Sequence, residues 1–280
     1  MKTMLSLCIF SSILVISLFA DDTKEASSQK IDVLSQLQGN EGILSFGNNK
    51  CYIQLPDNYS TASKSPLILF FHGRGGSAAK SNFTTPDFAN FRKKAAAKGY
   101  IVAVPGYGSD CWFNADAEKI TLQMIDFLAK NISCETERFF VMGCSMGGGA
   151  ALTFTARHPE KVKAVCDIFG ITDFTRFYND GFYNASISKA YGGSPSERPD
   201  YYRNQSAINL TAKYKGIPFL ILHGDRDRCV PKWNSDTLVD KMQKENINVK
   251  YIQIKGVGHE NRIVINQEDN ILKFFDDFSK

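Results

Sequence analysis

The sequence predicts an α/β fold, in which a mostly parallel sheet carries helices on both faces and an insertion separates two strands. Three observations predict it. Short apolar stretches alternate with longer segments of helical composition, which is the pattern of strand–helix–strand units. Stretches such as Pro66–Phe71 are apolar without interruption, as in a strand that is covered on both faces. Glycine-rich loops follow several of these stretches directly, where the carboxyl edge of such a sheet would lie.

The strands are recognised by their composition and by where they stop. Residues Asp21–Gly47 are polar, and we expect a loose lead-in with one short helix. Cys51–Leu55 then alternates apolar and polar residues and stops at Pro56-Asp57. The full set of predicted strands is Cys51–Leu55, Pro66–Phe71, Tyr100–Val104, Phe139–Met142, Val162–Ile168, Ile217–His223 and Val249–Ile254.

The helices fill the intervals between these strands. Phe88–Lys98 has helical composition and is closed by Gly99, a residue that commonly ends helices. The predicted helices are Phe88–Lys98, Ala117–Lys130, Ala150–Arg157, Trp233–Glu245 and Asp269–Phe278. The one interruption of this rhythm is Gly170–Lys215, which we expect to form a lid.

The amino end has the features of a secretory signal peptide over residues 1–20. Lys2 supplies the positive start, Met4–Phe19 the apolar centre, and Ala20 a cleavage position. The apolar run is shorter than the ~20 residues that span a bilayer, which disfavours an uncleaved anchor. We therefore expect a secreted protein with a single domain over residues 21–280, and no membrane association after cleavage.

The charge distribution argues against a nucleic-acid partner. Lysine and arginine number 33 and aspartate and glutamate 29, for a net charge of +4. The basic residues are scattered along the chain without a cluster, whereas nucleic-acid and anionic-membrane surfaces need a patch. The sequence does not indicate an oligomeric state.

Asparagines and cysteines are both consistent with export. Six Asn-x-Ser/Thr sequons indicate N-glycosylation, with an unmodified polar surface as the alternative. They begin at Asn58, Asn82, Asn131, Asn184, Asn204 and Asn209. Six cysteines remain once Cys8 leaves with the signal, and we expect one to three disulfides, although some could be buried free thiols. These are Cys51, Cys111, Cys134, Cys144, Cys166 and Cys229.

The chemistry centres on Gly143-Cys144-Ser145-Met146-Gly147, a Gly-x-Ser-x-Gly turn between a predicted strand and a predicted helix. Such a sharp turn brings backbones close together, so only residues of almost no size fit beside the serine. The hydroxyl of Ser145 is then exposed at the carboxyl edge of the sheet, where the next helix directs its free N–H groups. We expect Ser145 to be a nucleophile.

A second loop, His72-Gly73-Arg74-Gly75-Gly76, follows the Pro66–Phe71 strand. Its backbone N–H groups could stabilise an oxyanion beside Ser145, and the N–H groups of Arg74 and Met146 are the candidate donors. A phosphate-binding loop is the alternative, but the chain has no Gly-x-x-x-x-Gly-Lys motif. A plain tight turn is the other alternative.

Two further loops supply an acid and a base. His223–Pro231 carries Asp225 and Asp227 after a strand, and one of these acids is expected to orient a histidine. A metal site built from His223 and both acids is the disfavoured alternative, because no fourth ligand is nearby. His259 lies in Gly256-Val257-Gly258-His259 after the last strand and could act as the general base. A lone histidine such as His158 is more often a surface residue.

With its four loops in this order, the chain resembles an α/β-hydrolase over nearly all of residues 21–280. His72–Gly76 corresponds to the oxyanion loop, Gly143–Gly147 to the nucleophile elbow, Asp225–Pro231 to the acid loop and Gly256–His259 to the histidine loop. The resemblance implies an α/β-hydrolase fold and a triad of Ser145, Asp227 and His259, with neither metal nor cofactor.

Two groups within the fold are similar. The Cys111-Trp112 pair resembles secreted esterases of the polyhydroxybutyrate-depolymerase type, which include feruloyl esterases. Tyr191-Gly192-Gly193 and His223–Pro231 resemble the catalytic domain of prolyl-oligopeptidase-type peptidases. In both groups the matching acid is the one before x-x-Val-Pro, which favours Asp227 over Asp225. No large propeller precedes the match in this sequence, which counts against a typical oligopeptidase, whose extra domain filters peptides by size.

The insertion is rich in aromatic residues, which could wall a pocket for an aromatic acyl group or a sugar, or could simply form the core beneath the lid. These residues are Phe169, Phe174, Phe177, Tyr178, Phe182, Tyr183, Tyr191, Tyr201 and Tyr202. The sequence as a whole predicts a secreted serine hydrolase acting on a small-molecule or polymer-borne ester. A peptidase that uses the same triad, either an aminopeptidase or an acyl-peptide hydrolase, is the first alternative, and a non-catalytic binding protein is the second.

Overall fold

One eight-stranded sheet organises the chain in the computed structural model, which describes residues 33–279. The strands are β1 Glu41–Phe46, β2 Asn49–Gln54, β3 Leu67–Phe71, β4 Ile101–Pro105, β5 Phe139–Cys144, β6 Val162–Ile168, β7 Phe219–Gly224 and β8 Val249–Ile254. They lie in the order β1-β2-β4-β3-β5-β6-β7-β8. β2 is antiparallel to β1 and β4, and all other neighbours are parallel. The predicted mostly parallel sheet is therefore confirmed.

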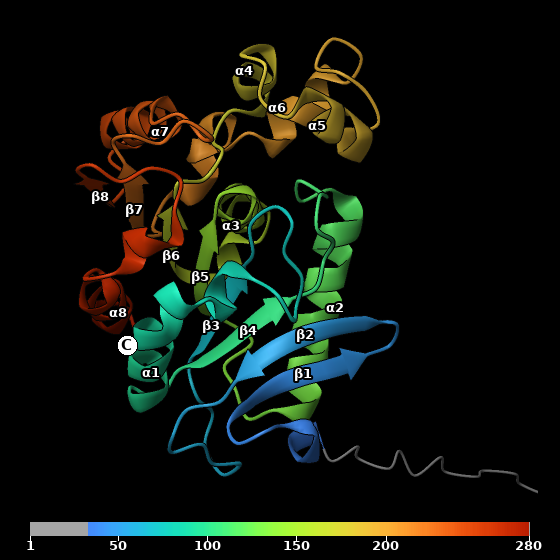
Figure 1. The fold of residues 1–280 in the computed structure, drawn as a ribbon, viewed down its shortest axis with the longest axis vertical. Helices are drawn as coiled ribbons and strands as arrows, with labels where there is room; N and C mark the ends of the chain where they lie inside the picture. The colour runs from blue at the N-terminus through green and yellow to red at the C-terminus, as the bar shows by residue number, and fades with distance from the viewer. Residues whose placement is uncertain (1–32, 280) are drawn as a thin grey trace, which may run out of the picture. The chain divides into compact units, whose positions relative to one another are not determined.

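Helices cover both faces of this sheet (Figure 1). They are α1 Ala89–Ala97, α2 Ala115–Asn131, α3 Met146–Arg157, α4 Phe174–Asn179, α5 Asn184–Tyr191, α6 Pro199–Gln205, α7 Trp233–Lys244 and α8 Glu268–Asp277. Leu128 of α2 and Phe154 of α3 belong to one hydrophobic core, and Phe91 of α1 and Phe275 of α8 to the other. Because successive side chains of a strand point to opposite faces, the continuous apolar strands supply both cores.

Two elements differ from the sequence prediction. The segment expected to be a loose lead-in contains β1, which turns at Gly47 (φ +55°) into an antiparallel hairpin with β2. Helix α3 begins at Met146 rather than at Ala150, because the glycines that disfavour a helix in isolation are needed here for close packing. A Cβ atom at Gly149 would lie 2.8 Å from the carbonyl oxygen of Ile171.

The expectation of disulfides is wrong for this structure, in which all six cysteines of the described segment are free thiols. Cys51, Cys134, Cys144 and Cys166 are buried within the two cores. Burial raises the pKa of the Cys51 and Cys134 thiols to about 12, because the thiolate would lose its hydration. These cysteines therefore act as small apolar core residues.

The predicted signal peptide lies outside the described residues. Within residues 33–279, none of the helices has both the length and the apolar character to cross a membrane.

The insertion between β6 and β7 forms helices α4, α5 and α6, which pack together (Figure 1). Most of its aromatic side chains are core residues. Phe174, Phe177, Tyr191 and Tyr202 are at most 2% exposed, whereas Tyr183 is 38% exposed. The core interpretation of these aromatics therefore holds for most of them, and Tyr183 is the exception.

Candidate active site

Ser145 is held in a strained backbone conformation between β5 and α3. Its φ of +58° and ψ of −122° lie in a region that residues with a side chain rarely adopt. The Ser145 N–H donates to the Ile168 carbonyl at 3.0 Å, and the Gly149 N–H donates to the Ser145 carbonyl at 3.1 Å. These bonds fix the turn from both sides, and this arrangement places the serine at the sheet edge.

The glycines around Ser145 are required by close backbone contacts. A Cβ atom on Gly143 would lie 2.1 Å from the carbonyl oxygen of Gly147. A Cβ atom on Gly147 would lie 2.1 Å from the carbonyl oxygen of Phe71. No side chain fits at these distances, so this Gly-x-Ser-x-Gly motif reflects packing of β3, β5 and α3.

Ser145, His259 and Asp227 form a chain of hydrogen bonds, although 114 residues separate the serine from the histidine. The Nε2 atom of His259 lies 2.9 Å from Ser145 Oγ, and its Nδ1 atom lies 2.7 Å from Asp227 Oδ2. Because a carboxylate only accepts hydrogen bonds, Nδ1 carries the proton and Nε2 is free to accept from the hydroxyl. The three residues predicted from separate loops thus lie in one place.

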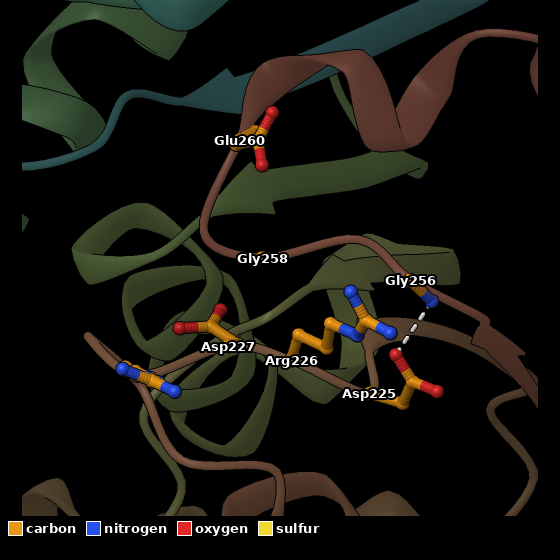
Figure 2. A pocket seen from close by; sticks show the side chains of 7 residues that line it. Asp225, Arg226, Asp227, Gly256, Gly258 and Glu260 are labelled. Atoms are coloured by element: carbon orange, nitrogen blue, oxygen red, sulfur yellow. Dashed lines mark hydrogen bonds between the residues drawn. The ribbon is translucent and has the colours of Figure 1, made fainter.

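The structure also distinguishes the two acids of the β7 loop. Asp227 Oδ1 accepts from the N–H groups of Cys229 and Val230, both at 2.9 Å, which leaves Oδ2 for His259. Asp225 instead accepts from the Gly256 N–H at 2.6 Å. In Figure 2 the Asp225 carboxylate faces Gly256, at a distance from Asp227. Asp225 therefore connects the acid loop to the histidine loop through Gly256, and it is Asp227 that bonds His259.

The loop after β3, which lines the same cavity as Ser145, uses most of its N–H groups in hydrogen bonds of its own. Gly73 N–H donates to Asn82 Oδ1, Gly75 N–H to the Ser109 carbonyl, and Gly76 N–H to the Gly73 carbonyl. The Arg74 N–H makes no hydrogen bond within the described part of the chain, and the same is true of the Met146 N–H. Since most N–H groups of the loop are already used, the loop does not suit a phosphate group, which needs several free donors.

A buried histidine, His223, lies near the carboxyl end of strand β7, four residues before Asp227. Its Nε2 atom lies 2.9 Å from the Val230 carbonyl, and its Nδ1 atom lies 2.7 Å from Ser235 Oγ. Burial lowers the pKa of His223, because the imidazolium would lose its hydration. The ring is therefore neutral, with its proton on Nε2. Among residues 33–279 no cluster of three or more His, Cys, Asp or Glu side chains could hold a metal ion.

Behind the serine lies a second buried titratable group, Asp167 of β6. It is fully buried, and neither carboxyl oxygen has a hydrogen-bond partner in the described structure. Burial raises its pKa to about 7, and the Gly170 backbone opposes this shift in part without making a hydrogen bond of normal geometry. A Cβ atom on Gly148 or Gly170 would lie 2.3 Å from Asp167 Oδ1, so the two glycines make room for this carboxyl.

Ser145 and His259 open onto a cavity of about 280 Å³. Its lining also includes Phe169 and Tyr183, two of the aromatics that the sequence offered as a possible pocket wall, and Asn82 and Asn261, which the sequence did not assign to the site. Tyr183 lies beneath the guanidinium of Arg74, 5.0 Å from ring centroid to Cζ. Asn82 was noticed only as a sequon, and nothing in the sequence near Asn261 signalled a role. A larger hollow of about 580 Å³ lies beside Asp225, Arg226 and Glu260 (Figure 2) and does not include Ser145.

Sequence comparison identifies the family. The model of the prolyl oligopeptidase family (Peptidase_S9) matches residues 119–280, which include Ser145, Asp227 and His259. The chain belongs to the prolyl oligopeptidase family. It is accordingly a serine hydrolase.

The chain is similar in sequence to fungal dipeptidyl-aminopeptidases. The chain is 26% identical over 206 residues to a probable dipeptidyl-aminopeptidase B of Paracoccidioides lutzii. The match covers 69% of this chain and 22% of that protein. A probable dipeptidyl-aminopeptidase B of Emericella nidulans is 27% identical over 207 residues, with the same shares. The chain thus spans about a fifth of the length of the curated relatives it matches.

Solved structures confirm the α/β-hydrolase fold. An S-formylglutathione hydrolase from Agrobacterium tumefaciens superimposes with a TM-score of 0.71 at 16% identity, over 87% of this chain and 98% of that one. A truncated carbohydrate esterase from gut microbiota gives a TM-score of 0.67 at 19% identity, over 82% and 90%. Dipeptidyl peptidase 4 of Porphyromonas gingivalis gives 0.69 at 18% identity, over 85% of this chain and 35% of that one.

Proposed function

We propose that this serine hydrolase cleaves carboxylic esters through Ser145, His259 and Asp227, with an acyl-enzyme intermediate. The observation that carries the proposal is the position of His259, which lies 2.9 Å from the serine hydroxyl and 2.7 Å from a fully buried carboxylate. The neutral imidazole can accept the hydroxyl proton, and Asp227 can stabilise the imidazolium that results.

The steps follow from this arrangement. Ser145 Oγ attacks the ester carbonyl carbon while its proton passes to His259 Nε2, and the carbonyl π electrons move onto the oxygen. That oxyanion accepts hydrogen bonds from the free N–H groups of Arg74 and Met146. The intermediate collapses, the C–O bond to the alcohol breaks, and His259 returns the proton to the leaving oxygen. Water then repeats the sequence on the acyl-enzyme, releases the acid and restores the serine.

The lining of the cavity favours an ester over a peptide with a free amino terminus. An ammonium group needs a carboxylate partner, and none of the eight residues that line the cavity is an aspartate or a glutamate. Glu260 lies next to His259 but forms an ion pair with Arg262. Arg74 at the rim forms an ion pair with Asp110 at 2.7 Å, so that nearby carboxylate is also already engaged.

A peptidase is the second candidate, because the family match and the named dipeptidyl-aminopeptidases support it. The same triad can cleave an amide, since His259 can protonate the leaving amine. Purified protein should be assayed on short acyl, feruloyl and hydroxybutyrate esters, and in parallel on dipeptidyl and acyl-peptide amides. Turnover of the amides alone would contradict the ester proposal.

Ser145→Ala tests the nucleophile directly. We expect the variant to keep its fold, to lose turnover by at least about 10⁴-fold and to resist a fluorophosphonate probe that labels the native protein. Ser45→Ala, at an exposed position of β1, is the matched control and should behave as the native protein. Labelling or turnover that survives in Ser145→Ala would place the nucleophile elsewhere.

Export and glycosylation are part of the proposal. The apolar segment after Lys2 supports a cleaved leader, and Asn58, Asn204 and Asn209 are exposed sequons that could accept a glycan. Expression in a eukaryotic secretory host, with amino-terminal sequencing and a mass measurement before and after deglycosylation, tests both cleavage and glycosylation.

We propose further that the insertion acts as a lid over the cavity, since Tyr183 extends from it into the cavity lining.

A further inference from the structure

The side chain of Asn82 connects two loops of the proposed active site. Its Oδ1 atom accepts from the Gly73 N–H at 2.6 Å, and its Nδ2 atom donates to Asn261 Oδ1 at 2.7 Å. Gly73 directly precedes Arg74, and Asn261 follows His259 by two residues. One amide therefore links the loop of the oxyanion donor to the loop of the general base, and its bond to Asn261 joins residues 179 apart in sequence.

Asn82 is itself firmly anchored. The next residue, Phe83, is fully buried and packs against the ring of Phe70 with centroids 5.3 Å apart. Thr85 Oγ1 donates to the Asn82 carbonyl at 2.7 Å, and Arg92 Nη1 donates to the Phe83 carbonyl at 2.5 Å. The backbone that carries the Asn82 side chain is therefore held in place by the core, so its amide can hold the two loops at a fixed separation.

The oxyanion loop needs such a constraint at Gly73. A Cβ atom there would lie 2.9 Å from Asn82 Oδ1, so the position favours glycine. Glycine leaves the backbone free to rotate, and a misdirected Arg74 N–H would no longer face the reacting oxygen. The bond from Gly73 N–H to Asn82 fixes the peptide plane on one side of this pivot.

We infer that Asn82 is a positioning residue for acyl transfer. It holds the Arg74 N–H through Gly73 and the His259 loop through Asn261, so that donor and base keep their relative position during the reaction. This inference rests on the proposed function of Ser145. Because preorganised donors act mainly on the transition state, loss of Asn82 should lower kcat and leave KM nearly unchanged.

The same contacts imply that the Asn82-Phe83-Thr84 sequon is not glycosylated. A glycan would be joined to Nδ2, the atom that donates to Asn261 at the wall of the cavity. Asn82 is therefore unmodified even in a protein whose exposed sequons carry glycans.

The test compares Asn82→Ala, Asn261→Ala and the double variant on a short acyl ester, with active sites counted by fluorophosphonate labelling. We expect Asn82→Ala to lower kcat per labelled site by about 10- to 100-fold with KM changed less than about threefold. Asn261→Ala breaks one of the two bonds and should cost about 3- to 10-fold in kcat. Since both variants break the same bridge, the double variant should lose little more than Asn82→Ala alone. Asn58→Ala, at an exposed sequon, is the control and should match the native protein.

Three results would overturn the inference: a kcat per labelled site within twofold of native for Asn82→Ala, multiplicative losses in the double variant, or a glycan found at Asn82 by peptide mass. If Asn82→Ala does not fold, Asn261→Ala decides by the same criterion, and a native kcat for it rejects the bridge. Failure of the proposed function is separate, because it would appear as turnover by Ser145→Ala.

Discussion

His223 Nε2 lies 3.6 Å from Asp227 Oδ2, and both side chains are fully buried. The same Nε2–H donates to the Val230 carbonyl, while the Val230 N–H donates to Asp227 Oδ1. A buried carboxylate requires such support, because an ion removed from water is costly unless donors surround it. His223 thus supports Asp227 in two ways. Its Nε2–H dipole lies close to the carboxylate, and its hydrogen bond holds Val230, whose N–H donates to that carboxylate.

Replacement of His223 should weaken both fold and catalysis. His223→Leu leaves the Val230 carbonyl and the Ser235 hydroxyl buried without partners, at about 1–3 kcal/mol each. We expect kcat/KM to fall at least about tenfold, since a small displacement of Asp227 misaligns His259. His223→Gln retains an N–H donor and should lose less of both. Denaturant unfolding and kinetics check this, and a His223→Leu protein with native stability and activity would contradict it.

Gly147→Ala should not give an active protein. The added methyl would meet the Phe71 carbonyl oxygen at 2.1 Å, so β3 and α3 would have to separate, at a cost of at least about 3 kcal/mol. Gly216→Ala is the control, since that site is open and has a φ of +83°. Its cost should be about 1–2 kcal/mol from backbone conformation alone. Thermal unfolding measures both, and equal costs would show that crowding at Gly147 is relieved by a local shift.

Asp167 should make stability fall as the pH rises. Its pKa is raised from 3.8 in the unfolded chain to about 7 in the folded one, so between these values the folded state holds a proton that the unfolded state has released. The free energy of unfolding from this group therefore decreases between about pH 4 and pH 7 and is constant above. Asp167→Asn has no proton to release, so its free energy of unfolding, compared with that of the native protein, should rise by a few kcal/mol from about pH 4 to pH 7. A difference that does not vary with pH would exclude a buried, protonated Asp167.

Tyr183 should distinguish aromatic acyl groups from short ones. Its ring lines the cavity beside Ser145 and lies under Arg74. Tyr183→Ala should raise the KM for an aromatic acyl ester about 3- to 10-fold, which corresponds to the loss of one aromatic contact. The KM for a short acyl ester should change by less than about twofold. Phe182→Ala is the control, because that ring stacks on Phe177 at 4.9 Å and does not line the cavity. Equal effects of Tyr183→Ala on both esters would show that the ring does not contact the acyl group.

The parts of the site that could be predicted are those with a local signature. Ser145 lies in a recognisable five-residue Gly-x-Ser-x-Gly motif, and His259 and Asp227 each follow a strand in glycine-containing loops. The physical reason to choose Asp227 over Asp225 comes only from the structure, because both acids follow the same strand in sequence. Asp227 contacts His259, whereas Asp225 contacts Gly256.

The parts that could not be predicted depend on contacts between distant segments. Asn82 and Asn261 meet although 179 residues separate them in sequence, and Asn82 carried a sequon that suggested a different use. Strand β1 was missed because its pairing with β2 depends on a turn at Gly47 rather than on its own pattern. The expected disulfides were inferred from an even count, which does not reveal that four of the six thiols are buried in the cores.

The backbone of Ser145 has one more consequence. A residue held at φ +58° and ψ −122° costs on the order of 1–3 kcal/mol, which the surrounding strands and helix must supply. If those neighbours loosen, the chain relaxes locally and the hydroxyl turns away from the imidazole while most of the sheet is still intact. Enzymatic turnover would then be lost at milder heat or denaturant than the circular dichroism of the sheet, so that inactivation reports on the tightness of this one bend.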